Sequence, residues 1–301
     1  MDYILQLLIL VVLYTMLSQS LNLSAGFTGL VSLSHAGFYG IGAYTTAVLG
    51  EHHLSFWINL PVAMLVNATI AMLVSCIAIR TVEDYFVICT LGIQVIIVSV
   101  LNNWTSVTKG SLGIAGIPAI SVFGLNLDNK ILFLMFSTCL MAVIWYLLNN
   151  VSRSGFGNTL RAISEDEIFA QSVGKNVYQS KIVAFTVGSV IATIPGALYA
   201  HYTSYIDPTS FSISESIFIL SIVILGGLGN LKGSLFAASF MIFIPELIRF
   251  AGLPNGIAAN LRQIMYGLIL VLVMVNTKSD LKDALARLVR VKSWLDSSPL
   301  T

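Results

Sequence analysis

Residues Arg153–Lys181 read RSGFGNTLRAISEDEIFAQSVGKNVYQSK, and this polar stretch interrupts an otherwise apolar chain. It holds 7 of the 29 charged residues (15 basic and 14 acidic). Within it, Ser164 precedes Glu167 by three residues, which is the spacing of a capping box, and Gly174 is a typical C-terminal stop. The pattern predicts a helix of about ten residues over Ser164–Gly174, too short to be stable alone in water. We therefore expect the rest of the chain, a partner protein, or both, to hold it.

The composition is not that of a soluble domain or of a nucleic-acid-binding protein, and the sequence lacks the common enzyme motifs. Hydrophobic residues make up 56% of the 301 residues and charged residues 10%, with a mean hydropathy of +0.88. A net charge of +1 gives no electrostatic support for binding nucleic acid. Cys76, Cys89 and Cys139 match no metal motif. Because the chain has no P-loop, GxSxG, HExxH or CxxC, we expect neither catalytic residues, nor a cofactor, nor a metal.

The apolar segments predict an all-α fold, a polytopic transmembrane bundle formed by residues 1–301 as a single domain. A span needs about 20 apolar residues. The sequence from Asn22 to Gly50 is rich in glycine and serine, and leaves open one broken span or a re-entrant loop plus a span. About nine spans are expected, at Tyr3–Leu23, Ala36–Gly50, Trp57–Ile79, Tyr85–Trp104, Ile131–Leu148, Ile182–Tyr202, Ile217–Leu228, Gly233–Phe250 and Gln263–Asn276.

The distribution of basic residues predicts the orientation. If the 153–181 loop is cytoplasmic, 11 of the 15 basic residues fall inside and 4 outside. The N-terminus is then outside and the C-terminus inside. The tail over residues 278–296 is predicted to form a cytoplasmic amphipathic helix, which could contact a partner or rest on anionic membrane lipid.

Polar residues inside the predicted spans are candidates for a translocation path. Polar groups at membrane depth must be satisfied by protein or line a water-filled cavity, and broken helices often expose backbone to substrates. Close helix packing through small residues is an equally good interpretation. The candidates are Asn22, Ser24, Gly26, Ser34, His35, Asn102 and Asn103. Glu246 and Arg249, three residues apart, are predicted to form a structural ion pair.

Several segments in sequence order resemble one family of membrane proteins. The segments are NLSAGFTGLVSLSHAGFYGIGAY (Asn22–Tyr44), VTKGSLGIAGIP (Val107–Pro118), RAISEDEIFAQSVGKN (Arg161–Asn176), IPGALYAHYTSYIDPTSF (Ile194–Phe211) and ILGGLGNLKGSLFAA (Ile224–Ala238). Together they resemble the LivM-like branch of the branched-chain amino acid ABC transporter permeases, a group that also contains urea and short-chain amide permeases. The chain departs from the family pattern at Lys109-Gly110-Ser111 and at Asn276-Thr277-Lys278-Ser279.

The resemblance implies a permease subunit of an ABC importer in a prokaryotic inner (plasma) membrane. Its implied partners are a second, LivH-like permease, two ABC ATPase subunits and an extracytoplasmic substrate-binding protein. The short capped helix would be the coupling helix that follows ATP-driven closure of the ATPases. The implied ATPase-coupling residues are Arg161, Ser164, Glu165, Asp166, Glu167, Ala170 and Gly174.

Two other classes of function remain as alternatives. A stand-alone secondary transporter driven by an ion gradient would need a titratable residue inside the membrane, and Glu246 is the predicted candidate. A membrane-embedded enzyme would need clustered catalytic side chains at membrane depth, which the sequence does not show.

Overall fold

The computed structural model describes residues 2–250, apart from 53, 82, 123, 124 and 128, together with residues 264, 267, 268 and 271. The chain divides into two compact units, Met1–Glu246 and Leu247–Thr301. The predicted span Gln263–Asn276 is thus described at four helical positions only. The predicted C-terminal helix over 278–296 lies outside the described residues.

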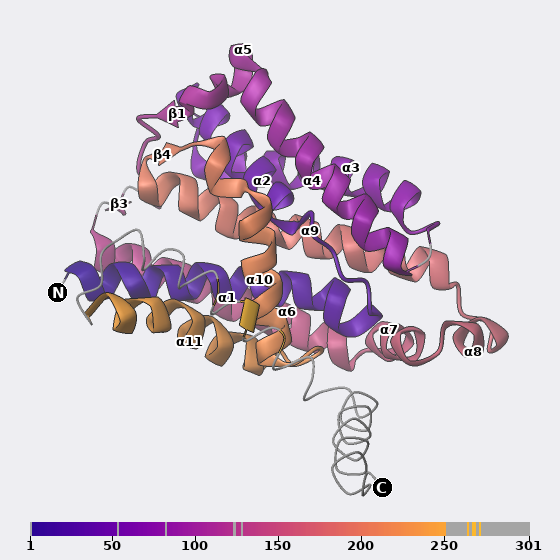
Figure 1. The fold of residues 1–301 in the computed structure, drawn as a ribbon. Coiled ribbons are helices and arrows are strands. Elements are labelled where there is room, and N and C mark those ends of the chain that lie inside the picture. Colours follow the sequence, from indigo (N-terminus) through magenta and orange to yellow (C-terminus); the bar gives the residue numbers. More distant parts are fainter. Residues whose placement is uncertain are drawn as a thin grey trace, which may run out of the picture. The chain divides into compact units, whose positions relative to one another are not determined.

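Eight of the predicted spans coincide with helices (Figure 1). Five of these helices, α1, α3, α4, α6 and α9, are long and apolar enough to cross a membrane. The helical bundle is therefore confirmed, while the count of nine spans and the orientation stay predictions. The eight helices are α1 (Asp2–Thr28), α2 (His35–Glu51), α3 (Phe56–Ala78), α4 (Glu83–Asn103), α6 (Lys130–Arg153), α9 (Val177–Thr203), α10 (Ile213–Gly226) and α11 (Leu231–Phe250).

Short elements lie at the two ends of α9. Its first turn follows α7 (Gly155–Glu165) and α8 (Glu167–Ser172). At its other end, β4 (Tyr205–Ile206) pairs antiparallel with β1 (Ile114–Ala115), with Ile114 opposite Ile206. These two-residue strands are a small departure from the purely helical prediction. The remaining short elements are α5 (Thr105–Thr108), η1 (Gly110–Leu112), the antiparallel pair β2 (Ser121–Val122) and β3 (Leu125–Asn126), and η2 (Pro208–Phe211).

Helix α9 packs against α1, α2 and α3. Small residues allow the close approach, because a Cβ added at Gly196 of α9 would lie 2.3 Å from the carbonyl oxygen of Tyr39 in α2. Buried Asn67 of α3 then joins the layers by donating its amide to the Phe38 carbonyl of α2 and to the Thr193 hydroxyl of α9, at 2.9 and 2.7 Å. These hydrogen bonds from one buried amide favour a single arrangement of the three helices.

In the structure, the stretch Asn22–Gly50 contains the end of one helix, a short connection and a second helix. Helix α1 is continuous to Thr28, and only residues 29–34 are non-helical. The first residue of α2, His35, lies 2.7 Å from the Ser20 hydroxyl, eight residues before the end of α1 and thus about 12 Å along its axis. Residues 29–34 therefore turn back into the bundle, and α2 begins in its interior.

Helix α10 is the second short element in the interior. It crosses the long helices instead of running alongside them (Figure 1). Its first turn meets that of α2, where the Ser216 hydroxyl accepts a hydrogen bond from the Ala36 amide at 3.1 Å. The bundle thus contains a junction of α1, α2 and α10, made by Tyr14, Ser20, His35, Ala36, Glu215 and Ser216, which we call the three-helix junction.

Candidate functional site

Helix α7 is amphipathic and lies against the end of α1 and against α6. Its N-cap is Ser154, whose hydroxyl accepts a hydrogen bond from the Gly157 amide. Leu160 and Ile163 are buried, and the Arg161 guanidinium sits 5.4 Å from the centroid of the Phe27 ring of α1. This cation–π contact places a predicted coupling residue directly on a membrane-crossing helix.

The predicted capping box is wrong. Ser164 lies inside α7, where its hydroxyl donates to the Arg161 carbonyl at 2.8 Å. Asp166 is the cap of α8, and its Oδ1 accepts a hydrogen bond from the Phe169 amide at 2.9 Å. Its extended backbone separates α7 from α8, so the predicted helix Ser164–Gly174 is the last turn of one helix followed by another. Asp and Ser are equally good caps, so the sequence alone did not discriminate between them.

The predicted C-terminal stop at Gly174 is confirmed. Its φ of +80° lies in the left-handed region that favours glycine. The Gly174 amide bonds the Gln171 carbonyl at 2.9 Å, and the Lys175 amide bonds the Ala170 carbonyl at 3.1 Å. These two bonds form a Schellman motif, which satisfies the last carbonyls of α8.

Helix α8 presents an apolar surface and is fixed to α9 on its other side. Ile168, Phe169 and Val173 are 81%, 63% and 61% exposed, and we call them the α8 surface. Ala170 instead packs inward against Ile163 and Val177. The small residue that sequence analysis placed on the coupling surface therefore serves the packing of α8 onto its own chain.

The residues predicted for a translocation path fall in three separate places. Asn22 and Gly26 hold the turn between α10 and α11: Asn22 accepts from the Gly229 amide at 2.8 Å and donates to the Ser234 hydroxyl at 3.2 Å. A Cβ at Gly26 would lie 2.3 Å from the Gly229 nitrogen. Ser24 is buried beside them and donates to its own helix. This group favours the interpretation as helix packing.

The second place is the three-helix junction, and the third is a hollow at the far end of α4. His35 bonds Ser20, and Ser34 bonds Ser32 at 2.9 Å. Asn102 and Asn103 line a hollow of about 370 Å³, which the first residues of α10 complete. The lining consists of Val95, Val98, Ser99, Asn102, Asn103, Ser212 and Ile213. The translocation path through these residues stays a prediction.

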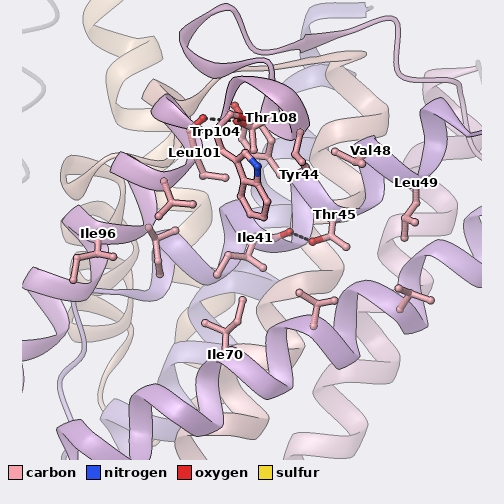
Figure 2. Close-up of a pocket in the computed structure, with 15 residues that line it drawn as sticks. Ile41, Tyr44, Thr45, Val48, Leu49, Ile70, Ile96, Leu101, Trp104 and Thr108 are labelled. Atoms are coloured by element: carbon pink, nitrogen blue, oxygen red, sulfur yellow. Dashed lines mark hydrogen bonds between the residues drawn. The ribbon is translucent and has the colours of Figure 1, made fainter.

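A larger apolar groove of about 500 Å³ lies between α2, α3, α4 and α5 (Figure 2). Ile41, Leu101 and Trp104 are among its lining residues. The hydroxyls of Thr45 and Thr108 donate to backbone carbonyls, each at 2.7 Å. None of the described residues that line the groove carries a charge, so they offer no group to neutralise an ammonium or a carboxylate.

Sequence analysis missed Glu215, because the seventh span was started at Ile217. The structure places Glu215 in the first turn of α10, where it accepts a hydrogen bond from the Tyr14 hydroxyl of α1. The available signal was a lone acidic residue two positions before an apolar run that begins at Ile217. The predicted ion pair of Glu246 with Arg249 involves the Arg249 side chain, which lies outside the part of the chain that the structure describes.

Together, the long apolar helices and the exposed helix pair α7–α8 define a multi-pass helical membrane protein. Its described residues contain no group of three or more His, Cys, Asp or Glu side chains that could hold a metal ion. A family profile described as "Branched-chain amino acid transport system / permease component" matches residues 3–274. The chain belongs to this family of transport permeases.

Individual relatives of the chain are also permease proteins of branched-chain amino acid transport systems. The chain is 34% identical over 261 residues to the high-affinity branched-chain amino acid transport system permease protein LivM of Salmonella typhimurium, covering 79% of this chain and 61% of the relative. It is 33% identical to the Escherichia coli LivM over 264 residues, 80% and 62% of the two chains. It is 22% identical to the S. typhimurium LivH over 244 residues, 74% and 77%. It thus spans just under two thirds of the two LivM relatives. No solved structure matches the chain.

Proposed function

We propose that this chain is a permease subunit of an ABC importer for branched-chain or related hydrophobic amino acids, in a prokaryotic inner membrane. The LivM relatives support this substrate class over urea or short-chain amides. The importer would contain a second, LivH-like permease, two ATPase subunits and an extracytoplasmic binding protein. The work comes from ATP on partner chains, so this chain needs no catalytic residue.

The α8 surface is the observation that carries this proposal. An exposed apolar triad on a six-residue helix and its C-cap is costly in water and is well suited to a groove in a partner protein. Helix α8 is attached to α9 through Glu167 and Lys181, and α7 contacts α1 through Arg161 and Phe27. Movement of a docked ATPase would thus be transmitted to two membrane-crossing helices. In this proposal α8 is the coupling helix and its end of the bundle is cytoplasmic.

Purification of the chain from its native membrane in mild detergent, followed by mass spectrometry, tests the proposal. We expect two ATPase subunits and a second permease to co-purify. A matched preparation of the Phe169→Asp variant should lose the ATPases and retain the second permease, because a charge on the α8 surface opposes burial. Purification of the chain alone would contradict the importer assignment.

The gradient-driven alternative is tested in the same preparation. After reconstitution, ATP-dependent uptake of leucine should persist in the Glu246→Gln variant and after collapse of ion gradients. Uptake that disappears with the gradient and continues without ATP would instead identify a secondary transporter.

A further inference from the structure

A carboxylate lies deep in the bundle, at the three-helix junction. The Tyr14 hydroxyl donates to Oε1 of Glu215 at 2.5 Å. Tyr14 is 12 residues from the start of α1 and 14 from its end, which places it about 18 and 21 Å from the two ends along the axis. Because α1 is long and apolar enough to cross a membrane, the Tyr14–Glu215 pair lies near the middle of the membrane.

This carboxylate has no cationic partner among the described residues. The two ion pairs found there join Lys109 to Glu51 and Lys181 to Glu167, both in other parts of the molecule. An ionisable group at this depth is expensive without a counter-charge, and groups that persist there usually serve an ion or substrate pathway. One tyrosine hydroxyl satisfies one carboxylate oxygen and contributes no positive charge.

The neighbours of Glu215 hold it in a fixed position. The next residue, Ser216, accepts a hydrogen bond from the Ala36 amide at the start of α2. One turn further along α10, Phe218 packs edge-on against the Tyr14 ring, with 5.0 Å between centroids. The carboxylate is therefore presented by a rigid frame of α1, α2 and α10, as a binding group needs to be.

Aromatic rings adjoin the carboxylate on α1 and α10. The Tyr14 hydroxyl bonds Glu215, and the ring of Phe218 packs edge-on against the Tyr14 ring. Tyr39 of α2 and Tyr199 of α9 form a second aromatic group with Phe211, with 5.7 Å between the two tyrosine rings. Aromatic faces attract cations, and they also accept the aliphatic part of a ligand. A carboxylate beside such rings is a suitable receptor for an ammonium group attached to an apolar side chain.

The hollow at the end of α4 lies beside the start of α10, close in sequence to Glu215. The side chain is only half-buried in this chain. The hollow that contains Asn102 and Asn103 is closed by Ser212 and Ile213, which precede Glu215 by three and two residues. This hollow thus extends to the start of α10.

We propose that Glu215, oriented by Tyr14, binds the ammonium group of the amino-acid substrate during its passage through the bundle. The proposal rests on the importer function proposed above and adds a substrate-contacting residue to it. The competing explanation is that the Tyr14–Glu215 hydrogen bond only joins α1 to α10. The two explanations differ in whether the negative charge, or only the hydrogen bond, is needed.

The test uses the complete importer with its partner permease, ATPases and binding protein, reconstituted in liposomes. Glu215→Gln keeps the size of the side chain and an acceptor for Tyr14, but removes the charge. Tyr14→Phe keeps the charge and removes the hydrogen bond. For each variant we would measure complex yield, basal ATP hydrolysis and uptake of radiolabelled leucine over a range of concentrations.

We expect Glu215→Gln to assemble and hydrolyse ATP like the wild type while leucine uptake falls at least about tenfold. Glu215→Asp should recover part of this uptake, and Tyr14→Phe should lose less than Glu215→Gln. Wild-type uptake in Glu215→Gln would overturn the proposal, and so would failure of Glu215→Gln to assemble, since the charge would then serve the fold. A wild-type importer that does not transport leucine would instead refute the proposed function.

Discussion

The ammonium of Lys181 lies 2.5 Å from Oε2 of Glu167, and the two side chains belong to different helices, α9 and α8. The Lys181 side chain is 8% exposed and that of Glu167 is 39% exposed. A buried lysine and a half-exposed glutamate thus attach the short helix to a membrane-crossing one.

Glu167→Gln should loosen α8 from α9. The change leaves the buried Lys181 ammonium without its counter-charge, and we expect a cost of about 1–2 kcal/mol, below that of a fully buried pair. Limited proteolysis of the purified importer should then cleave near α8 faster than in the wild type, and uptake per ATP hydrolysed should fall. Glu165→Gln is the matched control, because Glu165 lies outside the described ion pairs. Equal effects of the two changes would contradict this role of Glu167.

Asp166→Ala should weaken α8 by removing its N-cap. The expected cost to the helix is about 1 kcal/mol, because the Phe169 amide loses its acceptor. The readout is the amount of ATPase subunit retained after detergent washing. Ser164→Ala is the control, since the Ser164 hydroxyl bonds only a carbonyl inside α7 among the hydrogen bonds of the described residues. If Ser164→Ala released more ATPase than Asp166→Ala, the assignment of the cap would be wrong.

Gly174→Ala should destabilise the end of α8 without any steric clash. A Cβ at Gly174 would meet no heavy atom within 4 Å, so the cost arises from the left-handed backbone alone, at about 1–2 kcal/mol. Complex yield and ATPase retention should fall. Gly155→Ala offers the comparison, because Gly155 is equally open but has no positive φ. Normal yield for Gly174→Ala would show that the Schellman motif is dispensable.

The sequence predicted the presence of the helices far better than it predicted the residues at which each helix begins and ends. Runs of apolar residues are a strong and local signal, so eight of the predicted spans coincide with helices, although some of their ends differ by four or five residues. The break near Asn22 was overestimated, because glycine and serine lower helix propensity but here allow close contact with α9 and α11. Only the packing around Gly26 shows why α1 remains helical to Thr28.

Several site residues could not be predicted from the sequence, because their roles depend on contacts that no local pattern indicates. The bond between Tyr14 and Glu215 joins residues 201 positions apart, so neither residue alone predicts it. The Ser164 capping box failed for the opposite reason, since two good capping residues lie two positions apart and only the break between α7 and α8 selects Asp166. Gly174 was predicted correctly because its role is local.

Asn22→Ala should destabilise the bundle strongly. The side chain satisfies the Gly229 amide, the Asn230 carbonyl and the Ser234 hydroxyl, so its loss leaves buried polar groups in an apolar interior. We expect a cost of about 2–3 kcal/mol, visible as a lower unfolding temperature in detergent. Asn103→Ala should have little effect, because among the hydrogen bonds of the described residues the Asn103 amide bonds only Ser99 of its own helix. A similar loss in both variants would argue against a special role for Asn22.

The orientation of the bundle can be tested with single cysteines, once Cys76, Cys89 and Cys139 have been replaced by alanine. Lys175 is exposed next to α8, and Leu112 is 83% exposed near the strand pair at the other end of α9. In intact cells, an impermeant thiol reagent should label Leu112→Cys and leave Lys175→Cys unlabelled. In inside-out vesicles the pattern should reverse, because the positive-inside rule predicts that the end of the bundle with more basic residues is cytoplasmic. Labelling of Lys175→Cys from outside would place α8 beyond the reach of any cytoplasmic ATPase and refute the coupling role.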